Sequence, residues 1–203
     1  MSEITAIFSD VGGVLGTNGW DRVARRSAAE KFHLDLVEFE DRHELVANAF
    51  DIGQLSLEEY LTRTVFYRPR DFSRDAFRNY MYAVSQPFTE SLEIVGRAAG
   101  SRRYLMATLN NESLELNLDR IERFGLRKYF SVFFSSCFLG MKKPDVQIYR
   151  LALALTQRVA GESLFIDDRP LNIECARSCG MQVLRYESPA QMEGELRRLG
   201  IAV

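Results

Sequence analysis

The stretch ITAIFSDVGGVLG, from Ile4 to Gly16, contains the first regular element of the chain and the abrupt end of that element. Ile4 to Phe8 is a short run of apolar and β-favouring residues, which predicts a buried strand. An acidic residue, Asp10, and a pair of glycines follow, a pattern typical of a tight loop after a strand. We therefore expect an interior strand with Asp10 at its carboxyl end.

The segment after this loop has helical patterns and no strand pattern. Apolar residues recur at helical spacing from about Trp20 to Val84, in four successive stripes. Ser56 and Glu59 form a capping box, S-x-x-E, at the start of the third stripe. Four amphipathic helices in succession predict a small helical bundle.

From Thr89 onward, short apolar runs alternate with helical stripes. The expected strands are 104–107, 132–134, 164–166 and 183–184. Such alternation indicates βαβ crossovers and a parallel sheet covered on both faces. We therefore predict an α/β protein with a three-layer α/β/α, Rossmann-like core. The core comprises residues 1–16 and 86–203, and residues 17–85 form a small all-helical subdomain inserted into it.

The composition narrows the classes of partner. Of 203 residues, 46% are hydrophobic and 27% charged, close to the average of soluble globular proteins. Lys and Arg number 26 and Asp and Glu 28, a net charge of −2, which argues against nucleic acid or an anionic membrane as partner. The first residues lack the basic region of a signal or transit peptide. We expect a cytoplasmic protein; the sequence leaves its oligomeric state open.

Polar residues gather where the expected strands end. They are Asp10, Thr108, the pair Lys142 and Lys143, and the pair Asp167 and Asp168. Ligands of open parallel sheets bind beyond the carboxyl ends of the strands, so these groups should converge on one crevice. Carboxylates suit Mg²⁺, while a hydroxyl and an ammonium group neutralise phosphoryl oxygens. The sequence therefore indicates a site for a phosphate group and a hard cation.

Four strings at these strand ends resemble, in order, the four motifs of the haloacid dehalogenase superfamily. They are DVGGVL (10–15), ATLNN (107–111), GMKKPD (140–145) and FIDDRPLNI (165–173). Each string alone is common, whereas four in the right order are specific. The helical segment after the first string resembles the cap of that family, so the resemblance covers essentially the whole chain.

The resemblance assigns roles to the acidic residues. Asp10 would be the nucleophile that attacks phosphorus and forms an aspartyl-phosphate. Mg²⁺ would be held by Asp10, by the backbone carbonyl of Gly12 and by Asp168, with Asp167 as a second ligand or an outer partner. Asn172, four residues beyond Asp168, would be a further outer partner.

The resemblance also implies a phosphate-binding set. Thr108 would hydrogen-bond the phosphoryl oxygens together with backbone amides at the start of the next helix. Leu109 and Asn110, which follow it, belong to the same phosphate-binding segment. Lys143 would stabilise charge on the nucleophile and the phosphoryl group, a role for which Lys142 is the weaker candidate.

One position departs from the family pattern. Phosphatases of this family usually carry a second Asp two residues after the nucleophile, where this chain has Gly12. General acid–base help is worth roughly 10²–10⁴ in rate. A surrogate acid would have to come from the cap, from residues 18–21 or from the substrate. His43 lies on an apolar stripe, which favours a hydrogen-bonded core histidine; the alternative is a substrate contact, as for Arg42 and Trp20.

These observations favour a Mg²⁺-dependent hydrolase of small phosphate monoesters, whose partner is a small phosphorylated metabolite. A metal-independent 2-haloacid dehalogenase, with Asp10 displacing halide, is an alternative. Asp167 and Asp168 disfavour it, because a metal-free site should not hold two further carboxylates near an anionic substrate. A third possibility, suggested by Gly12, is a catalytically weak phosphate-binding or regulatory protein.

Overall fold

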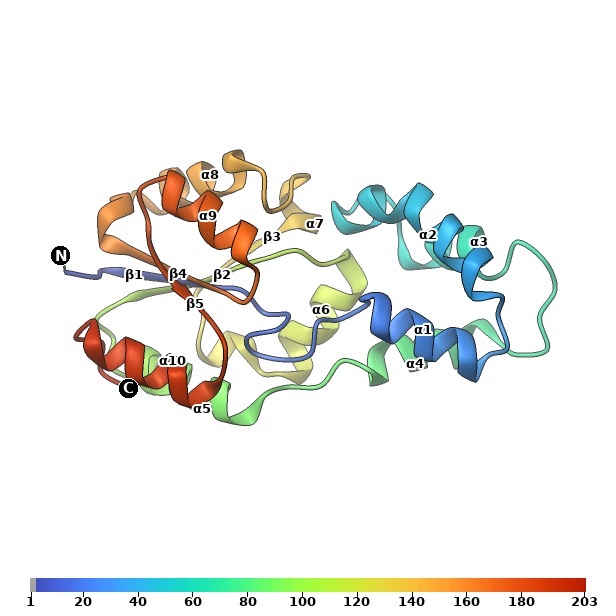
Figure 1. Ribbon diagram of the computed structural model, residues 1–203, viewed down its shortest axis with the longest axis horizontal. Helices are drawn as coiled ribbons and strands as arrows, with labels where there is room; N and C mark the ends of the chain where they lie inside the picture. Colours follow the sequence, from blue (N-terminus) through green and yellow to red (C-terminus); the bar gives the residue numbers. More distant parts are fainter. Residues whose placement is uncertain (1–2) are drawn as a thin grey trace.

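A computed structural model describes residues 3–203 of the protein as a parallel sheet with a helical layer on each face and a helical bundle at one end (Figure 1). The strands are β1 (Ala6–Ser9), β2 (Leu105–Asn110), β3 (Val132–Ser135), β4 (Ser163–Asp167) and β5 (Gln182–Arg185). Their order is β3-β2-β1-β4-β5, and every pair is parallel. The predicted α/β fold with a Rossmann-like core is confirmed.

Strand β1 lies at the centre of the sheet. It pairs with β2 on one side and with β4 on the other, so that Ser9 lies between Thr108 and Ile166. The chain adds β2 and β3 on one side of β1 and then returns to add β4 and β5 on the other. A crevice opens at such a change of direction, at the carboxyl ends of the strands. Asp10, which follows β1, is therefore placed at that crevice.

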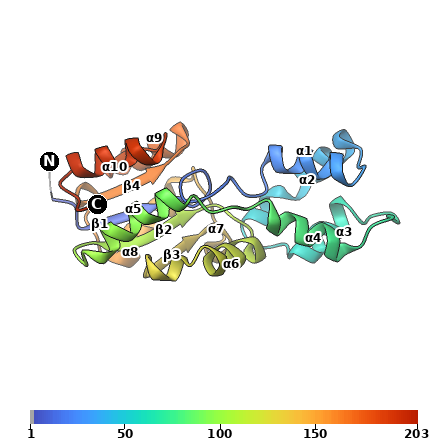
Figure 2. The ribbon, with the colours of Figure 1, turned by 90° about the horizontal axis from the view of Figure 1, so that it is seen from below.

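Two helical layers cover the sheet (Figures 1 and 2). One contains α5 (Thr89–Gly100), α6 (Leu114–Arg123) and α10 (Pro189–Arg198), and the other contains α8 (Val146–Thr156) and α9 (Pro170–Ser178). Neighbouring residues of β1 point to opposite layers, because side chains alternate along a strand. Ile7 packs in the cluster with α5, α6 and α10, and Phe8 packs in the cluster with α8 and α9.

Some features of the core were not expected from the sequence. Three short helices connect the main elements: η1 (Leu126–Lys128), α7 (Ser136–Leu139) and η2 (Ala160–Glu162). Strand β2 continues to Asn110, three residues beyond the expected end at Ala107. No helix within residues 3–203 combines the length and the apolar character needed to cross a bilayer.

Four helices between β1 and α5 form a separate bundle, here called the helical insert (Figure 2). They are α1 (Arg22–Lys31), α2 (Leu36–Asp51), α3 (Leu57–Thr64) and α4 (Arg74–Ala83). A cluster of buried side chains that includes Trp20, Phe39, Tyr60 and Phe77 fills its interior. The predicted capping box is present, since Ser56 and Glu59 exchange hydrogen bonds at the start of α3.

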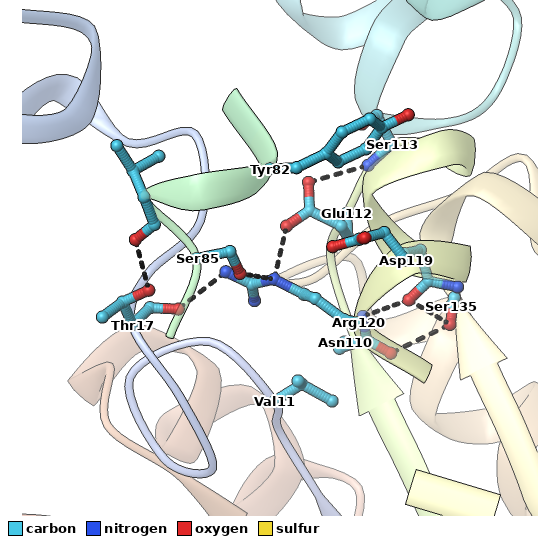
Figure 3. Close-up of polar contacts among 12 residues, drawn as sticks. Val11, Thr17, Tyr82, Ser85, Asn110, Glu112, Ser113, Asp119, Arg120 and Ser135 are labelled. Carbon is cyan, nitrogen blue, oxygen red and sulfur yellow. Dashed lines mark hydrogen bonds and ion pairs between the residues drawn. The ribbon is translucent and has the colours of Figure 1, made fainter. Parts of the chain in front are cut away.

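The two chain segments that join the insert to the core run side by side. The Thr17 amide donates to the Gln86 carbonyl at 2.9 Å. The buried side chain of Arg120, on α6, donates to the Thr17 carbonyl at 2.7 Å and to Ser85 Oγ at 2.8 Å (Figure 3). Glu112 Oε2 lies 3.5 Å from Arg120 Nε and balances its charge. The guanidinium group of Arg120 thus hydrogen-bonds to both segments that connect the insert to the core.

Candidate active site

A buried lysine lies between two acids at the end of β1. Lys143 Nζ is 3.0 Å from Asp10 Oδ2 and 2.6 Å from Asp167 Oδ2. Asp167 is the last residue of β4, and Asp10 directly follows the Ser9–Ile166 pair, so both acids point to the same face of the sheet. All three side chains are buried. The structure therefore brings together three of the predicted site residues from three separate segments.

A third acid completes a cluster with excess negative charge. Carboxylate oxygens of Asp10, Asp167 and Asp168 lie within 4.8 Å of one another. Burial raises the pKa of Asp10 to about 7, against the lowering effect of Lys143, and burial also raises the pKa of Asp168. Oδ1 of Asp168 is buried without a hydrogen-bond partner among the described residues. A cluster of oxygen ligands with an orphaned carboxylate oxygen fits a hard divalent cation.

Asp167 and Asp168 differ in how many protein donors already contact their carboxylate oxygens. Asn172 Nδ2 lies 3.0 Å from each carboxylate oxygen of Asp167, and the backbone amide of Arg169 donates to Oδ1 at 2.8 Å. With Lys143 on Oδ2, the Asp167 carboxylate is occupied by protein donors. Asp168 remains the freer ligand, while Asp167 positions Lys143.

The two glycines after Asp10 have different roles. Gly13 has φ +77°, and a Cβ there would lie 2.4 Å from Asp168 Oδ2, so only glycine allows Asp168 to approach the turn. Gly12 lines the cavity described below and is outside the left-handed region. A Cβ on Gly12 would lie 3.4 Å from Arg120 Nη1. The side of Gly12 on which the family carries an acid therefore faces a buried guanidinium group.

Thr108 does not lie in this cluster, which corrects the expectation that its hydroxyl binds phosphate. It is an interior residue of β2 and pairs with Ser9, so its side chain points to the face opposite Asp10. The register places Leu109 beside Asp10, and Leu109 packs in the cluster with α8 and α9. Oγ1 of Thr108 is buried without a partner among residues 3–203.

Asn110, which was also expected to bind phosphate, likewise bonds within the core. Asn110 Nδ2 donates to Asn117 Oδ1 at 3.0 Å, and Asn110 Oδ1 accepts from Ser135 Oγ at 2.9 Å (Figure 3). The next residue, Asn111, received no role from the sequence, yet it contacts the backbone of Lys143. Its Oδ1 accepts from the Lys143 amide and its Nδ2 donates to the Lys143 carbonyl, both at 2.8 Å. Asn111 thereby fixes the backbone that carries Lys143.

A cavity of about 520 Å³ joins this cluster to the helical insert. From the core it is lined by residues that include Asp10, Gly12, Asn111, Glu112 and Lys143, and from the insert by Trp20, Arg22, Arg25, His43 and Phe50. Two of the three weaker candidates from the sequence, Trp20 and His43, thus reach the cavity. Arg42 does not line it; its guanidinium group lies 3.3 Å from the centre of the Tyr67 ring.

Fold and site together define an α/β protein with an acid- and lysine-bearing crevice at the change of direction of its sheet. A sequence model of the haloacid dehalogenase-like hydrolases matches residues 4–180. The chain belongs to this family of hydrolases.

Relatives with known names or structures are distant. Flavin mononucleotide hydrolase 1 of Arabidopsis thaliana is 27% identical over 164 residues, which are 81% of this chain and 66% of that protein. A family enzyme from Bacteroides thetaiotaomicron, solved with magnesium and inorganic phosphate, is 18% identical with a TM-score of 0.73, over 91% of this chain and 94% of that one. An L-2-haloacid dehalogenase is 21% identical with a TM-score of 0.62, over 93% and 86% of the two chains.

These likenesses to solved structures establish the fold. The chain spans 66% or less of the length of the first curated relatives it matches.

Proposed function

We propose that the protein is a Mg²⁺-dependent hydrolase of small phosphate monoesters that acts through an aspartyl-phosphate on Asp10. The observation that carries this proposal is the cluster of buried Asp10 and Asp167 and half-buried Asp168 beside Lys143, in which Oδ1 of Asp168 has no partner among the described residues. Asp10, Asp168 and the Gly12 carbonyl would hold the ion. Bound there, Mg²⁺ would neutralise the charge between these acids and the phosphoryl oxygens.

The residues of the chain divide the chemistry among them. The Val11 amide donates to Asp10 Oδ1 at 2.7 Å, and Lys143 faces Oδ2, so the nucleophile is held by two donors. Attack by the Asp10 carboxylate forms an O–P bond and breaks the bond between phosphorus and the leaving alcohol. Water then releases phosphate and restores Asp10. Splitting one displacement into two is the advantage of a covalent intermediate.

In this proposal the helical insert is the cap that covers the substrate and sets specificity. The phosphoryl group would lie against Asp10 and Lys143, and the rest of a small phosphorylated metabolite would extend toward the insert. The names of the plant flavin mononucleotide hydrolase and of the magnesium- and phosphate-bound neighbour support this assignment. Metal-independent dehalogenation has less support, because Asp167 and Asp168 would repel an anionic haloacid.

A phosphate-binding protein with weak turnover is a second candidate. Two observations favour it: Gly12 offers no acid, and Thr108 brings no hydroxyl to the cavity. This candidate and the hydrolase differ in turnover, so a single set of assays separates them.

The first test measures metal-dependent stability and turnover. With Mg²⁺ and beryllofluoride at about 100 times their dissociation constants, wild type should melt roughly 5–10 °C higher than in EDTA. Asp168→Asn should lose this rise, whereas Asp41→Asn, at an exposed site on α2, should keep it.

An aryl phosphate should be cleaved with Mg²⁺ and not in EDTA. Binding of phosphate without turnover would favour the second candidate. Release of halide from a 2-haloacid in EDTA would favour the dehalogenase.

The second test concerns Gly12. Without an acid there, the leaving oxygen departs largely unprotonated, so log kcat/KM should fall steeply as the pKa of the leaving group rises. Gly12→Asp should not flatten this dependence, because the new carboxylate would meet Arg120 and stay ionised. Rates for a series of phosphate monoesters, with chemistry rate-limiting, measure both slopes. A flat slope in wild type would mean that another residue protonates the leaving group.

A further inference from the structure

Three side chains of the helical insert form a hydrogen-bonded chain that ends at the cavity. Trp20 Nε1 donates to the Tyr60 hydroxyl at 2.8 Å, and this hydroxyl lies 2.9 Å from His43 Nδ1. Tyr60 is fully buried, and its ring stacks on Phe50 with the ring centroids 4.2 Å apart. These three side chains are therefore a fixed part of the core of the insert, and among the described residues the His43 ring has one nitrogen, Nε2, without a hydrogen bond.

The chemistry of the three groups fixes where the hydrogens lie. An indole N–H can only donate, so the Tyr60 oxygen accepts from Trp20. The single hydroxyl hydrogen of Tyr60 then needs an acceptor, and His43 Nδ1 lies 2.9 Å from the hydroxyl oxygen. Nδ1 is therefore unprotonated, and the neutral ring carries its hydrogen on Nε2. A second hydrogen on Nδ1 would leave the buried Tyr60 hydroxyl without an acceptor, which is costly.

The charges around His43 also favour the neutral ring. Arg25 and Lys142 are the cations near it, and Glu40 is the nearby acid. Glu40 is engaged by both Arg25 Nε and Nη2 at 2.8–2.9 Å, so it offers little to an imidazolium. Burial and Arg25 lower the pKa of His43 to about 4. His43 is therefore not the missing acid of position 12, because a neutral imidazole does not release its N–H at neutral pH.

His43 lines the same cavity as Asp10 and Lys143. Its Nε2 has no hydrogen-bond partner among the described residues. The cations beside it are already paired, Arg25 with Glu40 and Lys142 with Asp51. The position beside the His43 ring is therefore suited to an uncharged acceptor, while Arg22 is the cation of the insert that lines the cavity without a carboxylate partner within residues 3–203.

We propose that His43 is a specificity-determining residue whose neutral Nε2–H binds a hydroxyl, ether or carbonyl oxygen on the leaving-group part of the substrate. The proposal rests on the proposed phosphatase function for its substrate. It favours phosphate esters of oxygen-rich alcohols over esters of plain alkyl alcohols.

The tautomer can be tested without any turnover. In ¹⁵N-labelled protein at pH 7, long-range proton–nitrogen spectra of the imidazoles should show His43 with Nδ1 unprotonated and Nε2 protonated. The chain has two histidines, so His33→Asn assigns the signals. Tyr60→Phe should mix the tautomers and raise the pKa of His43, while Tyr80→Phe, which removes a hydroxyl bonded to Ser27, should not. A charged ring or an Nδ1–H tautomer in wild type would overturn the proposal.

Matched substrates test the contact itself. Glycerol 1-phosphate and propyl phosphate differ in hydroxyl groups on a three-carbon chain. His43→Phe should lower the ratio of kcat/KM for glycerol 1-phosphate to kcat/KM for propyl phosphate by about tenfold, which corresponds to the loss of one neutral hydrogen bond. His43→Gln, which keeps a donor, should restore part of the ratio. An equal fall for both substrates would make His43 a packing residue and overturn the proposal.

The NMR measurement and the comparison of substrates distinguish a failure of the proposed function from a failure of the proposed role of His43. If no phosphate ester is turned over, the proposed function fails, and the NMR result still decides the state of His43. If esters are cleaved but the ratio is unchanged by His43→Phe, the hydrolase stands and the role of His43 does not.

Discussion

Asp10→Asn is expected to reduce turnover of phosphate monoesters by at least about 10⁴-fold, to the background of the assay, while the protein stays folded. The variant keeps the shape of the side chain and removes the charge that attacks phosphorus. It should also fail to form a beryllofluoride adduct with Mg²⁺, a mimic of the aspartyl-phosphate. Turnover of an aryl phosphate and ¹⁹F NMR of the adduct measure the two effects. Near-normal turnover would mean that water or another residue attacks.

The stability of this variant provides an internal control. The pKa of Asp10 is raised from 3.8 to about 7, so the stability that its protonated form supplies is complete below pH 4 and lost as the pH rises through 7. Asn has no such loss. In EDTA, the free energy of unfolding of the variant relative to wild type should therefore increase between pH 4 and pH 7. Urea unfolding at a series of pH values measures it, and a decrease would contradict this assignment.

Lys143→Met should have the largest effect on stability. The Lys143 side chain is 1% exposed and supplies the ammonium group between Asp10 and Asp167. Its removal leaves buried carboxylates without their cation, for which a cost of about 3–5 kcal/mol is typical. Turnover should also fall, because the charge that faces the nucleophile is lost. Urea unfolding in EDTA measures the first effect and an aryl phosphate assay the second.

The neighbouring lysine is the matched control for this change. Lys142 pairs with Asp51 at 2.9 Å and is about one-third exposed. Lys142→Met should therefore cost no more than about 1 kcal/mol. Mg²⁺ should recover part of the stability of Lys143→Met, since a cation would again face the acids. Equal losses in the free energy of unfolding for the two variants would mean that the position of Lys143 between two acids adds nothing to stability.

The sequence predicted the sheet well because each strand is a short apolar run with a clear polar end. Asp10, Lys143, Asp167 and Asp168 were placed together for the same reason, since they follow such runs or lie in the loop beyond them. The prediction for Thr108 was wrong because it placed the end of its strand too early. The apolar pattern stops at Ala107, but pairing with β1 and β3 extends β2 to Asn110. With Thr108 inside the strand, the alternation of side chains turns it away from Asp10.

Other parts of the site depend on contacts between distant segments. His43 meets Tyr60 from another helix, and Arg120 comes within reach of Gly12 from α6. Neither contact leaves a local pattern, because each residue lies on an otherwise ordinary helical stripe. The adjacent pair Asn110 and Asn111 is a local signal whose roles differ from the expected one. Asn110, predicted to bind phosphate, bonds within the core, and Asn111 holds the backbone of Lys143.

The paired connections at Thr17 and Gln86 have a consequence for exchanging parts of this protein. Because the chain leaves and re-enters the core at adjacent, hydrogen-bonded positions, residues 18–85 can be cut out and replaced without moving β1 or α5. A replacement bundle needs its first and last residues to lie side by side. It also needs to preserve the two acceptors of Arg120, which are the backbone carbonyl at position 17 and a hydroxyl at position 85. If the proposed function holds, exchange of this bundle for one from a related protein should change which substrates the crevice accepts, provided that the contacts of Asp51 with Ser136 and Lys142 are also kept.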